Sequence, residues 1–149
     1  MAKFIYKMQN ILDIKNKLET QEKTAFAIAV QKLRTEEERL VRIENEILGY
    51  EELIRQQNEG SINLQEWKRC NEALEYKKDE RKNQIQQIKL AQKNVDIARG
   101  RLNKVMIERK TQEVLKDKAF EDFVHEVNES EKKEVDELVS FTYNDKESR

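Results

Sequence analysis

Apolar residues recur at alternating intervals of three and four positions over residues 26–54, and no proline interrupts any part of the 149-residue chain. This spacing keeps one apolar side of an α-helix turned toward a partner helix, as in a coiled coil. Eight of the nine positions are apolar, and only Glu36 departs from the pattern. The nine seam positions are Phe26, Ala29, Leu33, Glu36, Leu40, Ile43, Ile47, Tyr50 and Ile54.

Charged residues make up 40% of the chain and hydrophobic residues 37%, a ratio that suits either a disordered chain or long amphipathic helices. The formal net charge of −1 and the absence of proline favour helices. The longest apolar run, residues 25–30, is too short to span a bilayer, and no leader pattern precedes Phe4. A single cysteine, Cys70, fits a reducing compartment. We therefore expect a cytoplasmic protein without a transmembrane segment.

Turn-forming residues gather only in segment 56–64, where Asn63 followed by Glu66 is typical of a helix N-terminus. We predict one coiled-coil hairpin over residues 1–149. Its first helix covers about 6–57, the reversal about 58–63, the second helix about 64–140 and a frayed tail 141–149. The second seam is weaker than the first. We expect it to pass through Trp67, Cys70 and Leu74, then a polar stretch at Lys78 and Arg81, and then Ile85, Ile88, Val95, Ala98, Leu102 and Val105. Near Arg109 we expect a shift of phase into a broader stripe, which consists of Val114, Leu115, Ala119, Phe120, Phe123, Val124, Val127, Val135 and Leu138.

The sign of the charge alternates along the chain. Residues 1–34 carry seven Lys/Arg and three Asp/Glu, whereas residues 35–59 carry three and eight. Residues 68–99 carry nine and five, whereas residues 119–149 carry four and ten. Folding back near Gly60 sets each block against one of opposite sign, and a parallel arrangement would set like charges together. The charge pattern therefore predicts that the two helices are antiparallel.

Motifs of catalysis are missing from the sequence. The three glycines are far apart, no serine lies in a nucleophile-elbow context, and the chain holds a single histidine. His125 has Glu121 and Glu129 one turn away on either side, but three such residues on one exposed helix do not make a metal site. We expect no catalytic residue, cofactor or metal, and we read Cys70 as a small buried hydrophobic residue.

Residues 68–118 hold fifteen Lys/Arg and eight Asp/Glu. Acidic residues are interspersed among the basic ones, as in helix-face ion pairs, so we expect no nucleic-acid partner. A basic nucleic-acid-binding coiled coil is the weaker alternative, and a structural scaffold that acts by oligomerisation is the stronger one.

Two terminal motifs resemble those of the flagellar FliJ family. The opening Phe4-Ile5-Tyr6-Lys7-Met8-Gln9-Asn10-Ile11-Leu12 is similar to the family's Phe-x-Tyr-x-(Leu/Met)-Gln-x-(Ile/Val)-Leu. The C-terminal signature is similar to Glu108-Arg109-Lys110, Glu113, Leu115-Lys116, Glu131-Lys132-Lys133 and Asp136-Glu137. The resemblance covers nearly the whole chain.

This resemblance implies a non-enzymatic component of the bacterial type III flagellar export apparatus, which serves motility and chemotaxis. It implies an antiparallel coiled coil similar to the stalk subunit of rotary ATPases, located peripherally on the cytoplasmic side of the membrane at the flagellar base. The terminal end would enter a hexameric export ATPase, the far end would approach the export gate, and export chaperones would also bind. By motif match, the ATPase-binding candidates are Phe4, Tyr6, Met8, Gln9, Leu12, Arg109, Lys110, Asp136 and Glu137. By position near the reversal, the gate- or chaperone-binding candidates are Tyr50, Trp67 and Leu74.

Overall fold

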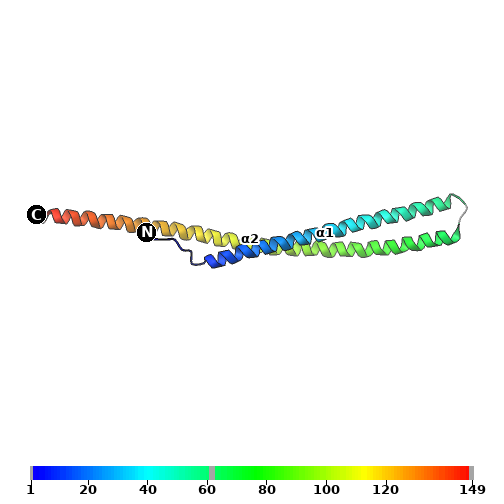
Figure 1. Cartoon of the computed structure of the whole chain (residues 1–149), viewed down its shortest axis with the longest axis horizontal. Coiled ribbons are helices and arrows are strands. Elements are labelled where there is room, and N and C mark those ends of the chain that lie inside the picture. Colours follow the sequence, from blue (N-terminus) through cyan, green and yellow to red (C-terminus); the bar gives the residue numbers. More distant parts are fainter. Residues whose placement is uncertain (1, 61–62, 148–149) are drawn as a thin grey trace. The chain divides into compact units, whose positions relative to one another are not determined.

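Two long helices make up the structure, a computed structural model that describes residues 2–60 and 63–147. Helix α1 spans Gln9–Asn58 and helix α2 spans Leu64–Glu147 (Figure 1). The two helices pack against each other, and the described residues contain no strand. This arrangement confirms the predicted all-α, antiparallel coiled-coil hairpin.

The N-termini of both helices follow from local hydrogen bonding. Helix α1 begins at Gln9 rather than near residue 6, because the backbone first closes a turn in which Gln9 N donates to Tyr6 O at 3.1 Å. Helix α2 begins as predicted. The Asn63 side chain accepts hydrogen bonds from the backbone N–H of Gln65 at 3.1 Å and of Glu66 at 3.5 Å, which satisfies donors that the helix leaves unpaired. Residues 61 and 62 of the predicted reversal lie outside the described residues.

Helix α2 continues to Glu147, beyond the predicted end near residue 140. Residues 101–147 contain neither proline nor glycine, and lysine and glutamate favour the helix, so nothing in this sequence stops it. Gly100 lies within the helix, and a Cβ atom there would meet nothing within 4 Å. It is therefore a glycine that the helix tolerates.

The chain divides into two compact units, Gln21–Asn103 and the combination of Met1–Thr20 with Lys104–Arg149. We call them the inner unit and the terminal unit. In the inner unit, α1 and α2 lie side by side (Figure 1), and all nine predicted seam residues of α1 are buried or partly buried. Its core cluster consists of Ile43, Ile47 and Leu74, against which Tyr50 and Ile54 pack. Farther along α2, the buried seam residues are Ala91, Val95 and Ala98.

Glu36, the polar exception in the α1 seam, has a partner on α2. Gln84 Nε2 donates to the Glu36 carboxylate at 2.5 Å and to the Glu36 backbone oxygen at 2.9 Å. Gln84 is 3% exposed and the neighbouring Ile85 is 37% exposed, so placing Ile85 in the seam was wrong. The polar seam position of one helix selects a polar residue on the other, because an unpaired carboxylate in the seam would be costly.

Opposite charges also meet across the inner unit. Lys77 Nζ lies 2.5 Å from a Glu46 carboxylate oxygen and 3.0 Å from one of Glu80, and these two hydrogen bonds raise the pKa of Lys77. The Arg99 guanidinium lies over the Phe26 ring at 5.7 Å from its centroid. The Glu46–Lys77 contact joins the acidic block of α1 to the basic block of α2, as the charge pattern predicts.

Candidate functional site

An aromatic cluster anchors the N-terminal segment of the terminal unit to α2. The Phe4 ring meets the Phe120 ring edge-on at a centroid distance of 5.2 Å, and the Phe123 ring at 5.5 Å. Such pairs stabilise beyond the area that they bury. The Tyr6 hydroxyl donates a hydrogen bond to Gln112 Oε1 at 2.8 Å. Residues 4–6 therefore lie along α2 ahead of the first turn of α1.

Ion pairs hold the two helices together beyond this cluster. Lys15 Nζ lies 2.7 Å from a Glu108 carboxylate oxygen, and this hydrogen bond lowers the pKa of Glu108. Arg109 lies between two carboxylates. Its Nη1 donates to Glu113 at 2.9 Å, and its Nε forms a close ion pair with the buried Glu19. Both carboxylates, with Glu113 first, raise the pKa of Arg109.

The seam of α2 keeps its spacing through this polar stretch, so the predicted phase shift near Arg109 was wrong. Partly buried positions continue at intervals of three and four residues through Val105, Arg109, Gln112, Lys116, Ala119 and Phe123. Of the apolar residues that we expected in the broader stripe, Val114, Leu115, Phe120 and Val124 are exposed, whereas Ala119, Phe123 and Val127 are partly buried on the continuing seam. Arg109 and Gln112 hold the register because Glu19 and Tyr6 give them partners on the N-terminal side.

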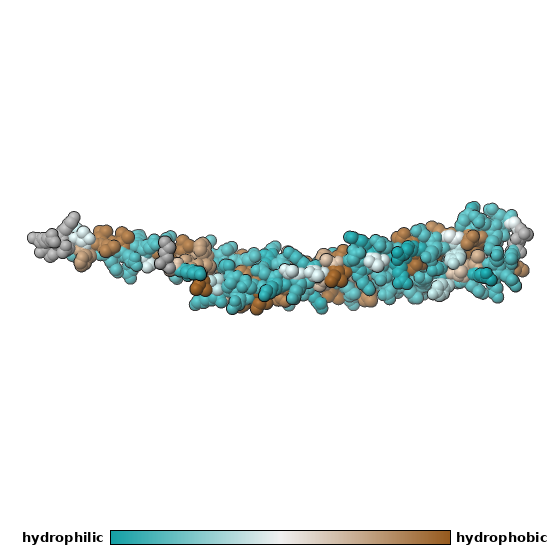
Figure 2. Space-filling model, viewed as in Figure 1, coloured by the Kyte–Doolittle hydropathy of each residue, from teal (hydrophilic) through white to brown (hydrophobic). Residues whose placement is uncertain are grey.

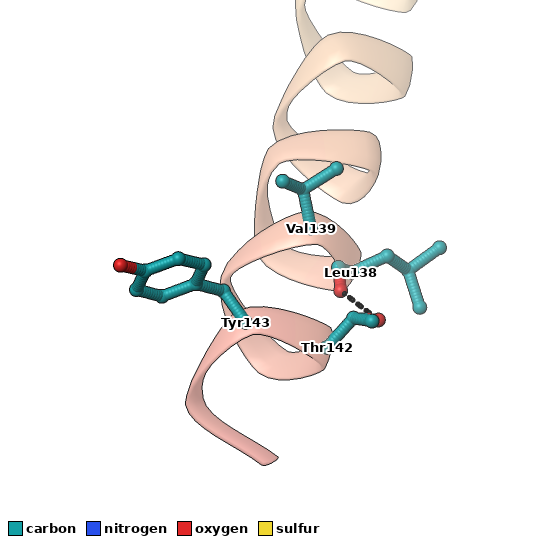
Figure 3. Close-up of a pocket in the computed structure, with 4 residues that line it drawn as sticks. All are labelled: Leu138, Val139, Thr142 and Tyr143. Atoms are coloured by element: carbon teal, nitrogen blue, oxygen red, sulfur yellow. Dashed lines mark hydrogen bonds between the residues drawn. The ribbon is translucent and has the colours of Figure 1, made fainter. Parts of the chain in front are cut away.

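Past the aromatic cluster, α2 has no neighbour within the described part of the chain, and every described side chain of residues 128–144 is exposed. Apolar side chains appear on this segment in brown at the C-terminal end (Figure 2). Leu138, Val139, Thr142 and Tyr143 surround a shallow hollow, where Thr142 Oγ1 donates to the Leu138 backbone oxygen at 2.9 Å (Figure 3). Phe141 and Leu138 line a second hollow with Glu134 and Glu137.

The structure brings together some of the predicted ATPase-binding residues and separates others. Phe4, Tyr6, Leu12 and Arg109 are engaged within the terminal unit, and Leu12 is buried. Gln9 donates to Asp13 at 2.9 Å. Four other candidates are exposed. Met8 and Lys110 lie beside the paired part of the helices, and Asp136 and Glu137 lie on the unpaired part of α2.

Sequence analysis assigned no binding role to the exposed apolar residues at the end of α2. Leu138 entered only as a member of the predicted stripe, and Phe141 and Tyr143 fell in the predicted frayed tail. Their signal was available: four large apolar side chains occur within residues 138–143, after an acidic run and without a helix breaker. In the structure, Leu138, Val139, Phe141 and Tyr143 are all exposed.

The three residues predicted for the gate or chaperones differ in accessibility. Leu74 is buried in the core cluster of the inner unit, and Tyr50 is half-buried against it. Trp67, in the first turn of α2, is exposed. A shallow groove lies beside Tyr50, lined also by Glu46, Gly49 and Leu53.

Metal-ligating and reactive side chains form no site in the part of the chain that is described. His125 Nε2 lies 3.1 Å from Glu129 Oε1, and both side chains are exposed. No group of three or more His, Cys, Asp or Glu that could hold a metal occurs among the described residues. Cys70 is partly buried and accepts a long contact from Gln57 Nε2 at 3.8 Å. Among those same residues, neither helix has a stretch long and apolar enough to cross a membrane.

One comparison with known proteins gives a match that covers nearly the whole chain. A family model described as Flagellar FliJ protein matches residues 4–148. The matched range contains both terminal motifs, the seam of the inner unit and the unpaired part of α2. No curated protein and no solved structure matches the chain at a significant level.

Proposed function

The chain belongs to the FliJ family of flagellar proteins, which places it in flagellar protein export, and we propose that it acts there as a stalk-like coupling factor. In this role the terminal unit inserts into the hexameric export ATPase. The protein itself catalyses no reaction, and it works on the cytoplasmic face of the membrane at the flagellar base.

The unpaired end of α2 is the observation that carries this proposal. A single α-helix is about 10–12 Å across with its side chains, so it can enter a narrower opening than a helix pair. Residues 128–144 have exposed side chains and combine acidic and large apolar residues. Large exposed apolar side chains mark binding surfaces. This end therefore suits insertion into a ring whose lining is partly apolar and partly basic.

Some of the ATPase-binding candidates position the terminal unit, and others are free to contact the ATPase directly. Phe4, Tyr6, Leu12 and Arg109 hold the N-terminal segment and α1 against α2, so we assign them a positioning role. Gln9 belongs with them, since it lies in the first turn of α1. The residues assigned to direct contact with the ATPase are Met8, Lys110, Asp136, Glu137, Leu138, Val139, Phe141 and Tyr143.

For the export gate and the chaperones, Trp67 is the candidate for direct contact, because Leu74 is buried and Tyr50 packs on the same core. Tyr50 can contribute only its exposed edge, beside Gly49 and Leu53. Leu74 supports this region through packing. Replacing Trp67 by Ala should weaken binding to the gate's cytoplasmic part in a titration, and unchanged binding would remove Trp67 from the interface.

ATP hydrolysis by the cognate export ATPase tests the coupling role. Adding the full chain should raise the hydrolysis rate and promote ring formation. Leu138→Asp should reduce this stimulation about tenfold, as expected for an apolar anchor at an interface. Leu48→Asp is the matched control, because Leu48 is 62% exposed and Leu138 is 66% exposed. An ATPase that ignores the wild-type chain at every ratio, or equal effects of the two substitutions, would contradict the proposal.

A further inference from the structure

Along residues 21–42 of α1 and 83–101 of α2, one face of the inner unit carries no acidic residue. In these two stretches it is formed by the residues that immediately precede the seam residues, and all of them are exposed. The opposite face, formed by the residues that follow the seam residues, includes Glu37, Glu44 and Asp96. We call the first surface the acid-free face; it consists of Gln21, Ala25, Ile28, Lys32, Thr35, Arg39 and Arg42 on α1 and Asn83, Gln87, Leu90, Asn94, Ile97 and Arg101 on α2.

Contacts within the inner unit place both halves of this face on the same side. Lys77 binds Glu46 of α1 and Glu80 of α2. Glu46 immediately precedes the seam residue Ile47, and Glu80 immediately precedes Arg81, a partly buried residue three positions before Gln84. The preceding positions of the two helices therefore lie together. The pairing of Glu36 with Gln84 and of Phe26 with Arg99 sets residues 21–42 alongside residues 83–101.

The centre of the acid-free face is apolar and its borders are basic. Ile28, Leu90 and Ile97 are 65%, 53% and 45% exposed, and Leu90 and Ile97 are one heptad apart on α2. Lys32 lies one helical turn after Ile28 on α1, Arg101 lies one turn after Ile97 on α2, and Arg39 and Arg42 extend the positive charge along α1. Exposed apolar residues with a charged border mark a binding surface, and positive charge selects an acidic partner. The fitting ligand is an acidic amphipathic helix.

The chain itself contains a helix of that kind. Residues 124–144 carry six Asp/Glu and two Lys, and their described side chains are exposed from residue 128 onward. Val124, Val135 and Leu138 supply exposed apolar side chains at helical spacing. Residues 83–101 span about 27 Å of helix, and residues 124–142 span the same length.

We propose that the acid-free face binds the acidic C-terminal segment of a second copy of this chain. The acidic and basic stretches of α2 belong to one uninterrupted helix, so the segment of one copy pairs with the face of another. The contact is heterologous, and each bound copy leaves one free face and one free segment, so association continues beyond a dimer unless a ring closes. This inference does not depend on the export role. Because the ATPase and the second copy would use the same segment, each would exclude the other.

Sedimentation velocity of the full chain, without ATPase, tests this proposal at low ionic strength and rising concentration. The wild-type chain should form species larger than a monomer, and added salt should disperse them. Leu90→Glu should raise the apparent dissociation constant about tenfold or more, because it places an acidic group where acidic side chains dock. Leu48→Glu is the matched control, since Leu48 follows the seam residue Ile47 on the opposite face and has similar exposure.

A charge exchange gives a second, independent measurement. Lys32→Glu with Arg101→Glu should weaken association, and so should Glu131→Lys with Glu134→Lys. A chain that carries all four substitutions should associate again, because both surfaces have exchanged sign. If circular dichroism shows that Leu90→Glu has lost helix, these charge variants still test whether the face binds the acidic segment.

Four results would overturn the proposal. The wild-type chain could remain a monomer at every concentration, or Leu48→Glu could weaken association as much as Leu90→Glu. The fourfold variant could fail to restore association. Finally, arbitrary duplex DNA could bind the wild-type chain at low salt. The substitutions Lys32→Glu and Arg101→Glu would then abolish DNA binding, whereas Leu90→Glu would leave it unchanged. That last result would make the face a phosphate-binding surface.

Discussion

The inner and terminal units use the same seam spacing but fill it with different side chains. In Gln21–Asn103 the buried seam is mostly aliphatic, with Ile43, Ile47, Leu74 and Val95 among its members. In the terminal unit three of the six seam positions on α2 between residues 105 and 123 are polar, namely Arg109, Gln112 and Lys116, and Leu12 is the buried apolar residue among those described. Ion pairs and one aromatic cluster there take the place of a continuous apolar core.

The two kinds of seam suit the two units to different tasks. Aliphatic burial is insensitive to salt and pH, and it suits a segment that must stay paired. Ion pairs with partial exposure weaken as salt rises or as carboxylates gain protons, so a seam built from them opens more readily. The unit that we assign to partner binding is thus the one with the less apolar seam.

The largest effect should come from Ile47→Ala in the aliphatic core. Ile47 is 3% exposed, and truncating a buried isoleucine costs about 2–4 kcal/mol of the free energy of unfolding. Denaturant unfolding followed by circular dichroism measures this loss. The neighbouring Leu48→Ala, at an exposed position, should change the free energy of unfolding by no more than about 0.5 kcal/mol. Similar losses for both substitutions would mean that the seam is not the source of stability.

A smaller and local effect is expected from Arg109→Met in the terminal unit. This change leaves the buried Glu19 carboxylate without its main cation, so amides of residues 9–20 and 104–123 should exchange hydrogen at least about tenfold faster. Adding Glu19→Met should recover most of the protection, since no buried charge then remains. Hydrogen exchange read by mass spectrometry locates the change.

Arg55→Met is the control for this measurement, because Arg55 pairs with Glu52 at an exposed position. Its removal should leave exchange unchanged beyond its own turn. Faster exchange in residues 70–98 after Arg109→Met would show that the two units open together, and the contrast between them would then be wrong.

The smallest effect concerns the partly exposed pair of Lys15 and Glu108. The hydrogen bond from Lys15 lowers the pKa of Glu108 in the folded chain below its ordinary value near 4.5. Its contribution to stability is therefore present above that pH and is lost as the pH falls through the lowered pKa. Thermal unfolding of wild type and Lys15→Met should differ near neutral pH and converge in acid. A difference that persists below the lowered pKa would exclude this pair as its source.

Local features of the sequence were sufficient for much of the fold. Asn63 predicted the start of α2 because an N-cap acts on the two or three residues that follow it. The seam from Phe26 to Ile54 was predicted correctly because apolar residues occupy eight of its nine positions. The candidate site was predicted less completely. Phe4, Tyr6, Leu12 and Arg109 do lie in one unit, but their engagement with Phe120, Gln112 and Glu19 depends on the opposite helix.

The sequence alone was enough to predict the helical character of the chain, the residues near which α1 ends and α2 begins, and the opposite direction of the two helices, since these follow from spacing, capping and blocks of charge. The tertiary structure decided the register. Gln84 rather than Ile85 enters the seam because Glu36 faces it, and Arg109 and Gln112 stay in the seam because Glu19 and Tyr6 bind them. Whether a residue on a helix is buried depends on its neighbour across the seam. The periodicity of one helix carries no information about which residue that neighbour is.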